Sequence, residues 1–286
     1  MPNRRTRKSE KESLLGVSVQ ELYAQWAVSD EHVGAALDES LAPRGPDWLF
    51  DLAAELGIQP QHLVLDAGCR DGRHSVELVR RFGSRVVGVD LVRANLDRGR
   101  ARIAGIANDE PDVAARVRFV QARVERLPFR DGTFDFVWCR DVLIHVAPLV
   151  DAFRECRRVL AEGGRMLVFQ MFATPLLEPT EAARLWPPLA AVPESADPTH
   201  FERCLEEAGF VVERREVLGS EWREFAEEEG KGKTSRQLLH VARLLRAADT
   251  FRQRFGRQVY ESELADSLWG VYQMIGKLSP RVYVLA

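Results

Sequence analysis

Short apolar runs alternate with amphipathic stretches from residue 61 onward. The apolar runs predict strands at 62–66, 85–90, 117–120, 134–139 and 165–171. The stretches between them predict helices over 73–81, 91–103 and 148–161, the last of which ends at the glycine pair Gly163-Gly164. Strands that alternate with helices of this length predict an α/β fold, in which a parallel sheet carries helices on both faces.

The regular alternation stops near residue 173. Six prolines fall within residues 173–198, which predicts an irregular excursion there. The elements predicted beyond it are a helix over 199–208 that ends at Gly209, a strand over 210–216, an exposed charged loop over 227–233, helices over 235–255 and 261–275 that each end at a glycine, and a strand over 281–285. A helical insertion therefore interrupts the last pair of strands.

The segment before the alternation has a different pattern. Residues 1–12 are polar and basic and lack the apolar core of a signal peptide, which predicts a disordered tail. Residues 13–58 predict an amino-terminal helical cover, in which Pro43 and Pro46 separate a first helix from a second over 47–56. The predicted domains are thus the tail, this cover, a core at 59–225, a helical lid at 226–279 and a final core strand at 280–286.

Composition narrows the class of protein. The chain has 286 residues, of which 45% are hydrophobic and 29% are charged, so it can bury a sizeable core. The formal net charge of −3 argues against nucleic acid or a membrane as a partner, although a near-neutral total can hide a local basic stripe. No apolar run approaches the ~18 residues of a membrane-spanning helix. Four widely spaced cysteines predict neither disulfides nor a zinc site, which fits a cytoplasmic protein.

Candidate chemistry lies where the first two predicted strands end. Asp66 closes the first strand just before a glycine-containing turn, and Asp90 closes the second. Ligands of open parallel sheets bind at the carboxyl ends of the strands, where a carboxylate such as Asp90 can accept both hydroxyls of a ribose. Gly68 and Gly72 let the backbone pass close to such a ligand. Arg70 stands where the dinucleotide-binding fingerprint needs its middle glycine, which argues against a nicotinamide-dependent oxidoreductase.

Six segments follow one another in a characteristic order. They are Leu65-Asp-Ala-Gly-Cys69, Val87-Gly-Val-Asp90, Leu127-Pro-Phe-Arg-Asp-Gly-Thr-Phe-Asp135, Arg140-Asp-Val-Leu-Ile-His-Val146, Glu155-Cys-Arg-Arg-Val-Leu-Ala-Glu-Gly-Gly-Arg165 and Glu206-Glu-Ala-Gly-Phe210. Jointly they resemble the class I S-adenosylmethionine-dependent methyltransferases of the small-molecule type, over about residues 60–217 and the final strand. The resemblance implies a Rossmann-like, seven-stranded, mostly parallel sheet with helical cover at both termini, and S-adenosylmethionine as cofactor with S-adenosylhomocysteine as its product.

The resemblance assigns cofactor contacts residue by residue. Gly68 and Gly72 would border the methionine part, Asp66 would fix the turn and the amino group, and Asp90 would hold the ribose. The other contacts would come from Tyr23 to the carboxylate, from the backbone N–H of Val124 to adenine and from the backbone carbonyl of Arg140 near the sulfonium, with Cys69, Leu91 and Arg123 beside them. Cys69 would be a small packing residue and not a nucleophile.

Two positions depart from the family pattern. Arg70 replaces the middle glycine of the first turn, so it needs either a different turn or a side chain that points away from the ligand. Arg123 stands where the family usually has the aspartate that meets the adenine amino group. Both fit tolerated variation; the sharper alternatives are a pseudo-enzyme or a cofactor variant with an extra anion for Arg70.

Methyl transfer from a sulfonium is an in-line displacement, so orienting the acceptor can supply ~7–11 kcal/mol. A base with a near-neutral pKa helps where the acceptor must lose a proton; His145 is the first candidate and His240 the second, while the other histidines are expected to be structural or exposed. The amino-terminal helix and the insertion would close over the methyl site as a lid. Aromatic side chains that could line a substrate pocket, or else belong to the core, are Trp26, Phe172, Trp222, Trp269 and Tyr272. No metal is expected.

Three classes of function stay open on these grounds. A small-molecule O-, N- or C-methyltransferase is favoured, because the covering segments are helical and are not nucleic-acid modules. An RNA or protein methyltransferase would be favoured by a contiguous arginine face beside the cleft. A non-catalytic partner protein with the cofactor fold would be favoured by failure to bind the cofactor. The predicted helices are compatible with a homodimer.

Overall fold

The computed structural model describes residues 17–286, apart from the side chains of residues 27–32, 230 and 231. The chain divides into two units, one up to Pro43 and the other from Arg44 to Ala286. The described part of the first unit contains helix α2 (Val19–Asp38), which opens with a capping box between Ser18 and Glu21. The first predicted helix is thereby confirmed, whereas the predicted tail at 1–12 lies outside the described residues.

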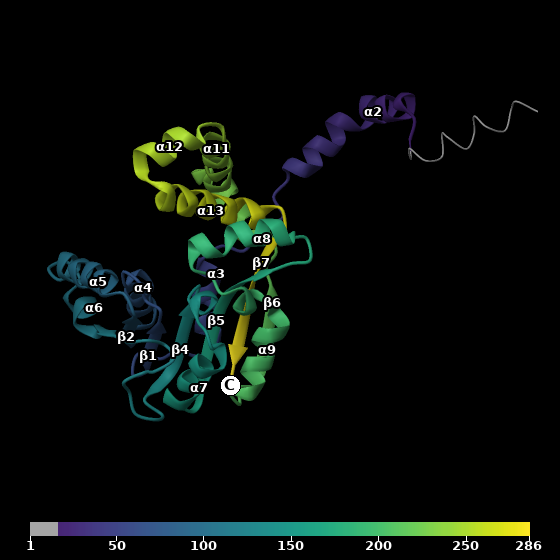
Figure 1. The fold of residues 1–286 in the computed structure, drawn as a ribbon. Coiled ribbons are helices and arrows are strands. Elements are labelled where there is room, and N and C mark those ends of the chain that lie inside the picture. The colour runs from purple at the N-terminus through teal and green to yellow at the C-terminus, as the bar shows by residue number, and fades with distance from the viewer. Residues whose placement is uncertain (1–16) are drawn as a thin grey trace, which may run out of the picture. The chain divides into compact units, whose positions relative to one another are not determined.

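A seven-stranded sheet organises the second unit (Figure 1). Its strands are β1 (Leu63–Ala67), β2 (Arg85–Asp90), β3 (Val117–Gln121), β4 (Phe134–Arg140), β5 (Leu160–Ala173), β6 (Val212–Val217) and β7 (Leu278–Leu285). They lie in the order β3-β2-β1-β4-β5-β7-β6, and β7 runs antiparallel to both of its neighbours. The predicted Rossmann-like sheet with an antiparallel last strand is confirmed.

Helices cover both faces of this sheet. On one face lie α3 (Asp47–Glu55), α4 (Arg73–Phe82), α5 (Arg93–Ile106) and α6 (Pro111–Arg116), and on the other lie α7 (Leu149–Val159) and α9 (Pro198–Glu207). Each face has its own apolar core, because side chains alternate along a strand. In β4, for example, Trp138 packs with the α3–α4 side and Cys139 with the α7–α9 side.

Helix α3 belongs to this core and not to a separate amino-terminal cover. Its Leu49 and Leu52 are 0% and 1% exposed and pack in the cluster that contains Trp138 of β4. The boundary between the two units falls after Pro43, in the break that the prolines predict. The predicted cover at 13–58 therefore does not form one piece.

The sequence predicts that the glycine pair Gly163-Gly164 ends a helix, and this prediction is wrong. Helix α7 already ends at Val159, and β5 begins at Leu160 and runs through both glycines. The pairing of β5 with β4 shifts register there, which is a bulge. A Cβ on Gly164 would lie 2.9 Å from the backbone oxygen of Asp135, so only glycine fits this close approach of two strands.

The proline-rich stretch after β5 contains more helix than predicted. It forms α8 (Pro179–Leu185) and two 3-10 turns, η2 (Pro187–Leu189) and η3 (Pro193–Ala196), each of which begins with proline. The backbone N–H of Val192 donates to the carbonyl of Ile144 at 2.8 Å. Ile144 lies in η1 (Leu143–His145), the 3-10 turn after β4, so this stretch is held against the end of β4.

The insertion before β7 forms a bundle of helices. These are α10 (Glu221–Ala226), a π-helical turn η4 (Glu227–Lys231), α11 (Lys233–Arg246), α12 (Ala248–Phe255) and α13 (Arg257–Met274). We call this whole bundle, residues 221–274, the cap. The charged stretch 227–233 is therefore not the loop predicted: Glu227 accepts the backbone N–H groups of Thr234 and Ser235 at the start of α11. The helix predicted over 235–255 breaks at Ala247, where φ is −121°.

The cap joins the sheet at the carboxyl ends of its parallel strands. Leu278, the first residue of β7, pairs with Ala173, the last residue of β5. A third apolar cluster ties α13 to η1 and to the stretch after β5 through Ala265, Ile144 and Trp186. Figure 1 shows α11, α12 and α13 together at that end of the sheet, opposite the carboxyl terminus.

Candidate functional site

The loop after β1 is fastened to the end of β2. The backbone N–H groups of Gly68 and Cys69 donate to the carbonyl of Val89 at 2.8 and 2.9 Å. The Asp90 carboxylate accepts the backbone N–H of Arg70 at 2.9 Å and that of Val92 at 2.7 Å. The residues predicted to contact the cofactor are thus brought together, because β1 and β2 are parallel neighbours whose carboxyl ends share one edge.

Arg70 keeps the backbone conformation that glycine would give this turn. Its φ is +51°, in the left-handed region that few residues other than glycine adopt. Its side chain is exposed, and its backbone N–H is the one held by Asp90. The departure from the family pattern therefore leaves the turn in place.

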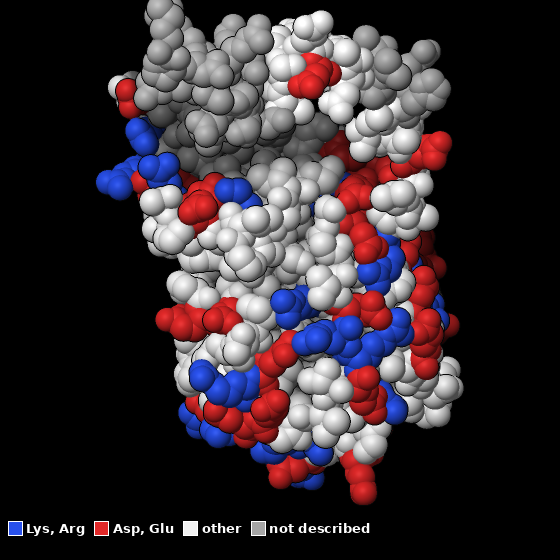
Figure 2. Space-filling view, turned by 90° about the vertical axis from the view of Figure 1, so that its right-hand side faces the viewer, with Lys and Arg blue, Asp and Glu red and all other residues white. Residues whose placement is uncertain are grey.

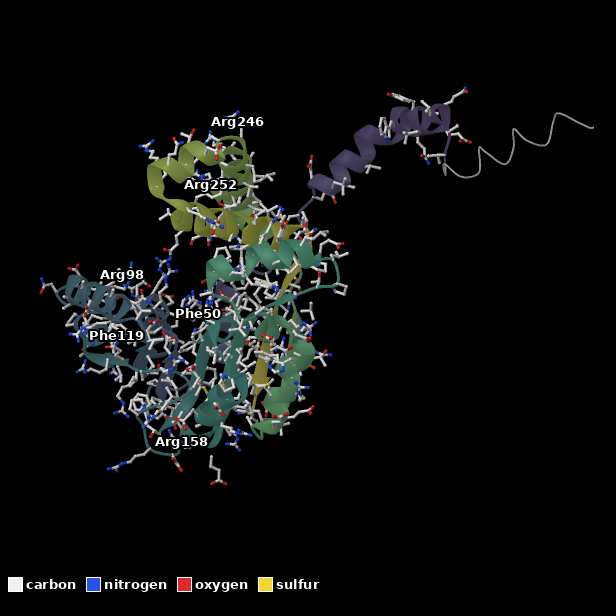
Figure 3. All side chains as sticks on the ribbon, viewed as in Figure 1. Phe50, Arg98, Phe119, Arg158, Arg246 and Arg252 are labelled. Carbon is white, nitrogen blue, oxygen red and sulfur yellow. The ribbon has the colours of Figure 1, made fainter. Side chains whose placement is uncertain are left out.

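Gly68 and Gly72 are required by packing as well as by conformation. Their φ angles are +77° and +71°. A Cβ on Gly68 would lie 2.5 Å from Val142, and one on Gly72 would overlap the ring of Phe119, which is marked on β3 in Figure 3. These contacts keep the loop tight against its neighbours. That the same glycines border the methionine part of a cofactor stays a prediction.

Asp66 is a buried carboxyl beneath this loop. It is 2% exposed, and its Oδ2 accepts the hydroxyl of Ser75 at 2.5 Å. Burial raises the pKa of Asp66 to about 7, so near neutral pH the group can hold or release a proton. Burial also raises the pKa of the neighbouring Cys69 thiol, which favours its protonated form. That Cys69 is a packing residue beside a cofactor stays a prediction.

The segment after β3 lies beside Asp90. The backbone N–H of Ala122 donates to the Asp90 carbonyl at 3.2 Å, and the Gln121 side chain donates to the carbonyl of Leu91 at 3.0 Å. Val124, two residues further, is 7% exposed. The guanidinium of Arg123 pairs with Glu125 at 2.7 Å, so its charge is already met by a carboxylate of the same loop.

A second group of side chains gathers at the end of β4. The Arg140 guanidinium lies 5.3 and 5.4 Å from the ring centroids of Trp222 and Phe169 and contacts Nε2 of His74 at 2.7 Å. His74 packs against Trp138 and against Phe50, which Figure 3 marks. Burial and the adjacent Arg140 lower the pKa of His74 to about 3, so a neutral ring accepts from the guanidinium.

Asp141 directly follows β4, and its carboxylate lies 3.7 Å from Nε of Arg140. Electrostatic interactions link its carboxylate with Arg140, Arg223 of α10, His145 of η1 and Lys233 of α11. Helix α10 reaches this end of β4, because the ring of its Trp222 lies over Arg140. Asp141, Arg223 and Lys233 were not among the predicted site residues. Asp141 stands inside the segment 140–146 that carries the family resemblance, which is the signal that could have identified it.

The two candidate histidines, His145 and His240, lie in different surroundings from each other and from His200. Nδ1 of His145 lies 3.0 Å from the carbonyl of Ala190 and must carry the proton of that hydrogen bond, which leaves Nε2 as a free acceptor. His240 lines a cavity formed by residues of α11, α12 and α13 alone. His200 contacts Arg203 and Cys204 of its own helix, so it is structural, as expected.

The aromatic residues predicted to line a substrate pocket divide into three groups. Trp222 lies at the end of β4, over Phe169 and Arg140. Phe172 is 1% exposed in the core on the α7–α9 face, so its assignment to the pocket is wrong. Trp269 and Tyr272 are half-buried in the third apolar cluster, where Trp269 packs against Trp186. For these two the pocket role stays a prediction.

Tyr23 and Trp26 belong to the first unit. Both are exposed on α2, at 62% and 49%, and their rings contact each other edge to face at 5.3 Å. Tyr23 as a contact to the cofactor carboxylate and Trp26 as a substrate contact both stay predictions.

The residues at the edge of β1 and β2 fit an S-adenosyl cofactor. Asp90 accepts three hydrogen bonds, from Arg70, Val92 and Asn95, and a carboxylate has about four acceptor positions, so acceptor capacity is left for a ribose hydroxyl. The buried Asp66 is a carboxyl whose charged form a cofactor ammonium would stabilise. No three His, Cys, Asp or Glu side chains within residues 17–286 gather as metal ligands.

Part of the chain matches a known protein family. Residues 65–168 match the methyltransferase domain family. Sterol 24-C-methyltransferase of Gibberella zeae is 32% identical over 127 residues, which are 44% of this chain and 32% of that protein. This chain spans half or less of the length of the first curated relatives it matches.

Solved structures share the fold at low sequence identity. Geranyl diphosphate C-methyltransferase from Streptomyces coelicolor, solved with S-adenosylhomocysteine, has a TM-score of 0.60 and 20% identity, covering 84% of this chain and 78% of that one. The cyclase SpnF has a TM-score of 0.64 and 21% identity, covering 86% and 85%. Proteins named for different activities thus share this fold, so function rests on the site. Among the described helices, none has the length and apolar character needed to cross a bilayer.

Proposed function

Because residues 65–168 form a class I S-adenosylmethionine-dependent methyltransferase domain, we propose that the whole chain transfers a methyl group from S-adenosylmethionine to an oxygen, nitrogen or carbon atom of a small molecule. The observation that carries the proposal is the hydrogen bonding of Asp90. This carboxylate closes β2, fixes the backbone of Arg70 in the loop after β1, and still has acceptor capacity for a ribose.

The side chains at this edge would bind and orient the reactants. Asp90 would accept from the ribose, the Val124 backbone would meet adenine, and Asp66 would face the amino group. The cofactor, when bound, supplies an electrophilic methyl group on sulfur. The chain's own contribution is then to hold an acceptor lone pair in line with that methyl group and to exclude water from it.

His145 would take the proton of an acceptor that must lose one. Its Nδ1 donates to the carbonyl of Ala190, so Nε2 is the nitrogen that would receive a proton from the acceptor. The residue lies on η1, directly after the strand whose end would lie under the sulfonium. A base so placed typically contributes a factor of ~10²–10⁴.

The test is a methyl-transfer assay on the full chain. S-adenosylmethionine labelled in its methyl group is incubated with pools of phenols, amines, carboxylic acids and isoprenoids, and labelled products are found by mass spectrometry. We expect one pool to gain the label with wild type and none to gain it with Asp90→Ala. Label transferred only to RNA or protein would support the alternative acceptor class, and cofactor binding without transfer to any acceptor would support a non-catalytic partner protein.

A homodimer and a cytoplasmic location stay predictions. The first is checked by light scattering of the purified chain and the second by fractionation of the source cells.

A further inference from the structure

One stretch of the cap is rich in positive charge, although the cap as a whole, residues 221–274, contains nine basic and nine acidic residues. Residues 231–257 contain eight Lys and Arg residues but a single acidic residue, Asp249, whereas the whole chain has a net charge of −3. The near-neutral total thus hides a basic region, and that region coincides with α11, α12 and the start of α13. A local excess of positive charge attracts negatively charged partners.

The arginines of this protein differ in their partners. In the cap, Arg252 pairs with Asp249 and Arg257 with Glu261. On the face over β6 and α9, the arginines pair with carboxylates: Arg165 with Glu213, Arg214 with Glu216, and Arg215 with Glu202. Figure 2 shows basic and acidic side chains interspersed over this face.

Three cap arginines have no such partner. Arg236, Arg243 and Arg246 form no ion pair with any residue in the described part of the chain. Figure 3 shows Arg246 at the outer side of the cap.

These three arginines form one stripe on α11 with a leucine between them. The spacing Arg236, Leu239, Arg243, Arg246 is i, i+3, i+7, i+10, which places all four side chains on one helix face. All four residues are exposed, Leu239 by 45%. A helix face that combines arginines with an exposed leucine matches surfaces that bind the interface of anionic bilayers.

An apolar cavity opens beside this stripe. Its volume is about 430 Å³, and Arg243 and His240 lie at its wall with Phe255 and Val259, which are 48% and 49% exposed. The other lining residues are Leu244, Phe251, Tyr260, Glu263 and Ser267. All of them come from the cap, so the cavity is separate from the edge of β1, β2 and β4 that carries the cofactor residues. It has the character of a site for an apolar chain under a basic rim.

We infer that the cap docks on a membrane surface that contains anionic lipids, with the α11 stripe on the lipid phosphates and an apolar chain in the cavity. The occupant follows from charge complementarity together with the exposed apolar side chains. A nucleic acid would find the same charge but little to stack on, because the exposed ring of Phe255 already stacks on Phe251. This docking does not depend on which acceptor the core methylates.

The test measures binding of the full chain to vesicles. Phosphatidylcholine vesicles with and without an equal share of phosphatidylglycerol are sedimented with wild type and with the triple variant Arg236→Glu/Arg243→Glu/Arg246→Glu. The matched control is Arg98→Glu/Arg154→Glu/Arg203→Glu, which changes the net charge equally through exposed arginines outside the cap. A further variant, Leu239→Gln, keeps the charges and removes the apolar contact. Circular dichroism of each variant verifies folding.

We expect wild type and the control to bind only the anionic vesicles, and salt to weaken this binding. At ~1 kcal/mol per basic residue near the surface, the triple variant should lose at least about a hundredfold in partition coefficient. Leu239→Gln should bind severalfold more weakly. The inference is overturned if wild type ignores anionic vesicles, if the folded triple variant binds as wild type does, or if an RNA oligonucleotide displaces the protein from them.

Discussion

The core and the cap are built from the same residue types but use them differently. In the core, Arg158 bonds to Glu155, to Asp131 and to backbone carbonyls, so its charge holds the molecule together. In the cap, Arg246 has no ion-pair partner among the described residues and stands on the surface. Polar side chains of the core hold the loops of the candidate active site, whereas the α11 arginines Arg236, Arg243 and Arg246 form no ion pair within the described residues. Charge in this protein therefore has to be interpreted region by region.

The largest expected difference between the core and the cap is the effect on turnover of removing one histidine from each. His145→Ala should lower turnover by ~10²–10⁴ while leaving the affinity for S-adenosylhomocysteine unchanged, because the base acts on the acceptor's proton. His240→Ala should leave turnover unchanged, since this residue lines a cavity made only of cap helices. Steady-state kinetics with the acceptor found in the transfer assay decides this. Loss of turnover in His240→Ala alone would transfer the role of base to the cap.

Replacing one glycine of positive φ in each region compares how tightly the core and the cap are packed. Gly72→Ala should destabilise the protein by ~2–5 kcal/mol, because a positive φ and overlap with Phe119 act together. Gly232→Ala, at the start of α11, should cost ~1–2 kcal/mol, since φ is also positive but open space surrounds the new Cβ. Urea unfolding of both variants measures the difference. Equal losses would show that the cofactor loop is packed no more tightly than the cap junction.

Asp66 couples the core's stability to pH. Its pKa is raised by burial from 3.8 to about 7, so the unfolded state loses the proton first and stability falls as pH rises from about 4 to 7. Asp66→Asn should abolish this loss and stabilise the protein by up to ~4 kcal/mol at pH 8, with little change at pH 4. The same variant should bind S-adenosylhomocysteine more weakly. Thermal unfolding at both pH values is the measurement, and an unchanged pH profile in Asp66→Asn would contradict the assignment.

Removing one arginine from each region gives the smallest effect. Arg158→Ala should cost ~1–2 kcal/mol, because several hydrogen bonds of a half-buried guanidinium are lost at once. Arg246→Ala should change stability by no more than ~0.5 kcal/mol, as surface substitutions without partners do. Denaturant midpoints compare the two. A loss in Arg246→Ala as large as that in Arg158→Ala would show that the cap arginines are structural.

The core could be predicted well from the sequence because its signals are local. Each strand from β1 to β4 is a short apolar run that ends at a turn, and the observed bounds lie within two residues of the predicted ones. Asp66 and Asp90 end such runs, so their positions at one sheet edge follow from the parallel order alone.

The wrong predictions concern residues whose sequence pattern is compatible with two different structures. Gly163-Gly164 serves a strand bulge where the sequence predicts a helix end, because glycine permits both conformations. Phe172 was assigned to the pocket, but side chains alternate along β5, so Phe169 faces Arg140 and Trp222 while Phe172 faces the opposite core. The partners of Asp141 come from helices far away in the sequence, and no local pattern encodes them.

The central claim is that the edge of β1 and β2 binds an S-adenosyl cofactor through Asp90. Calorimetric titration with S-adenosylhomocysteine tests it most directly, on wild type, on Asp90→Ala and on Arg98→Ala as a control from the exposed surface of α5. Wild type and Arg98→Ala should bind with micromolar affinity, roughly −8 kcal/mol, and Asp90→Ala should show no binding while remaining folded. Absence of binding to wild type, or equal binding by Asp90→Ala, would contradict the account.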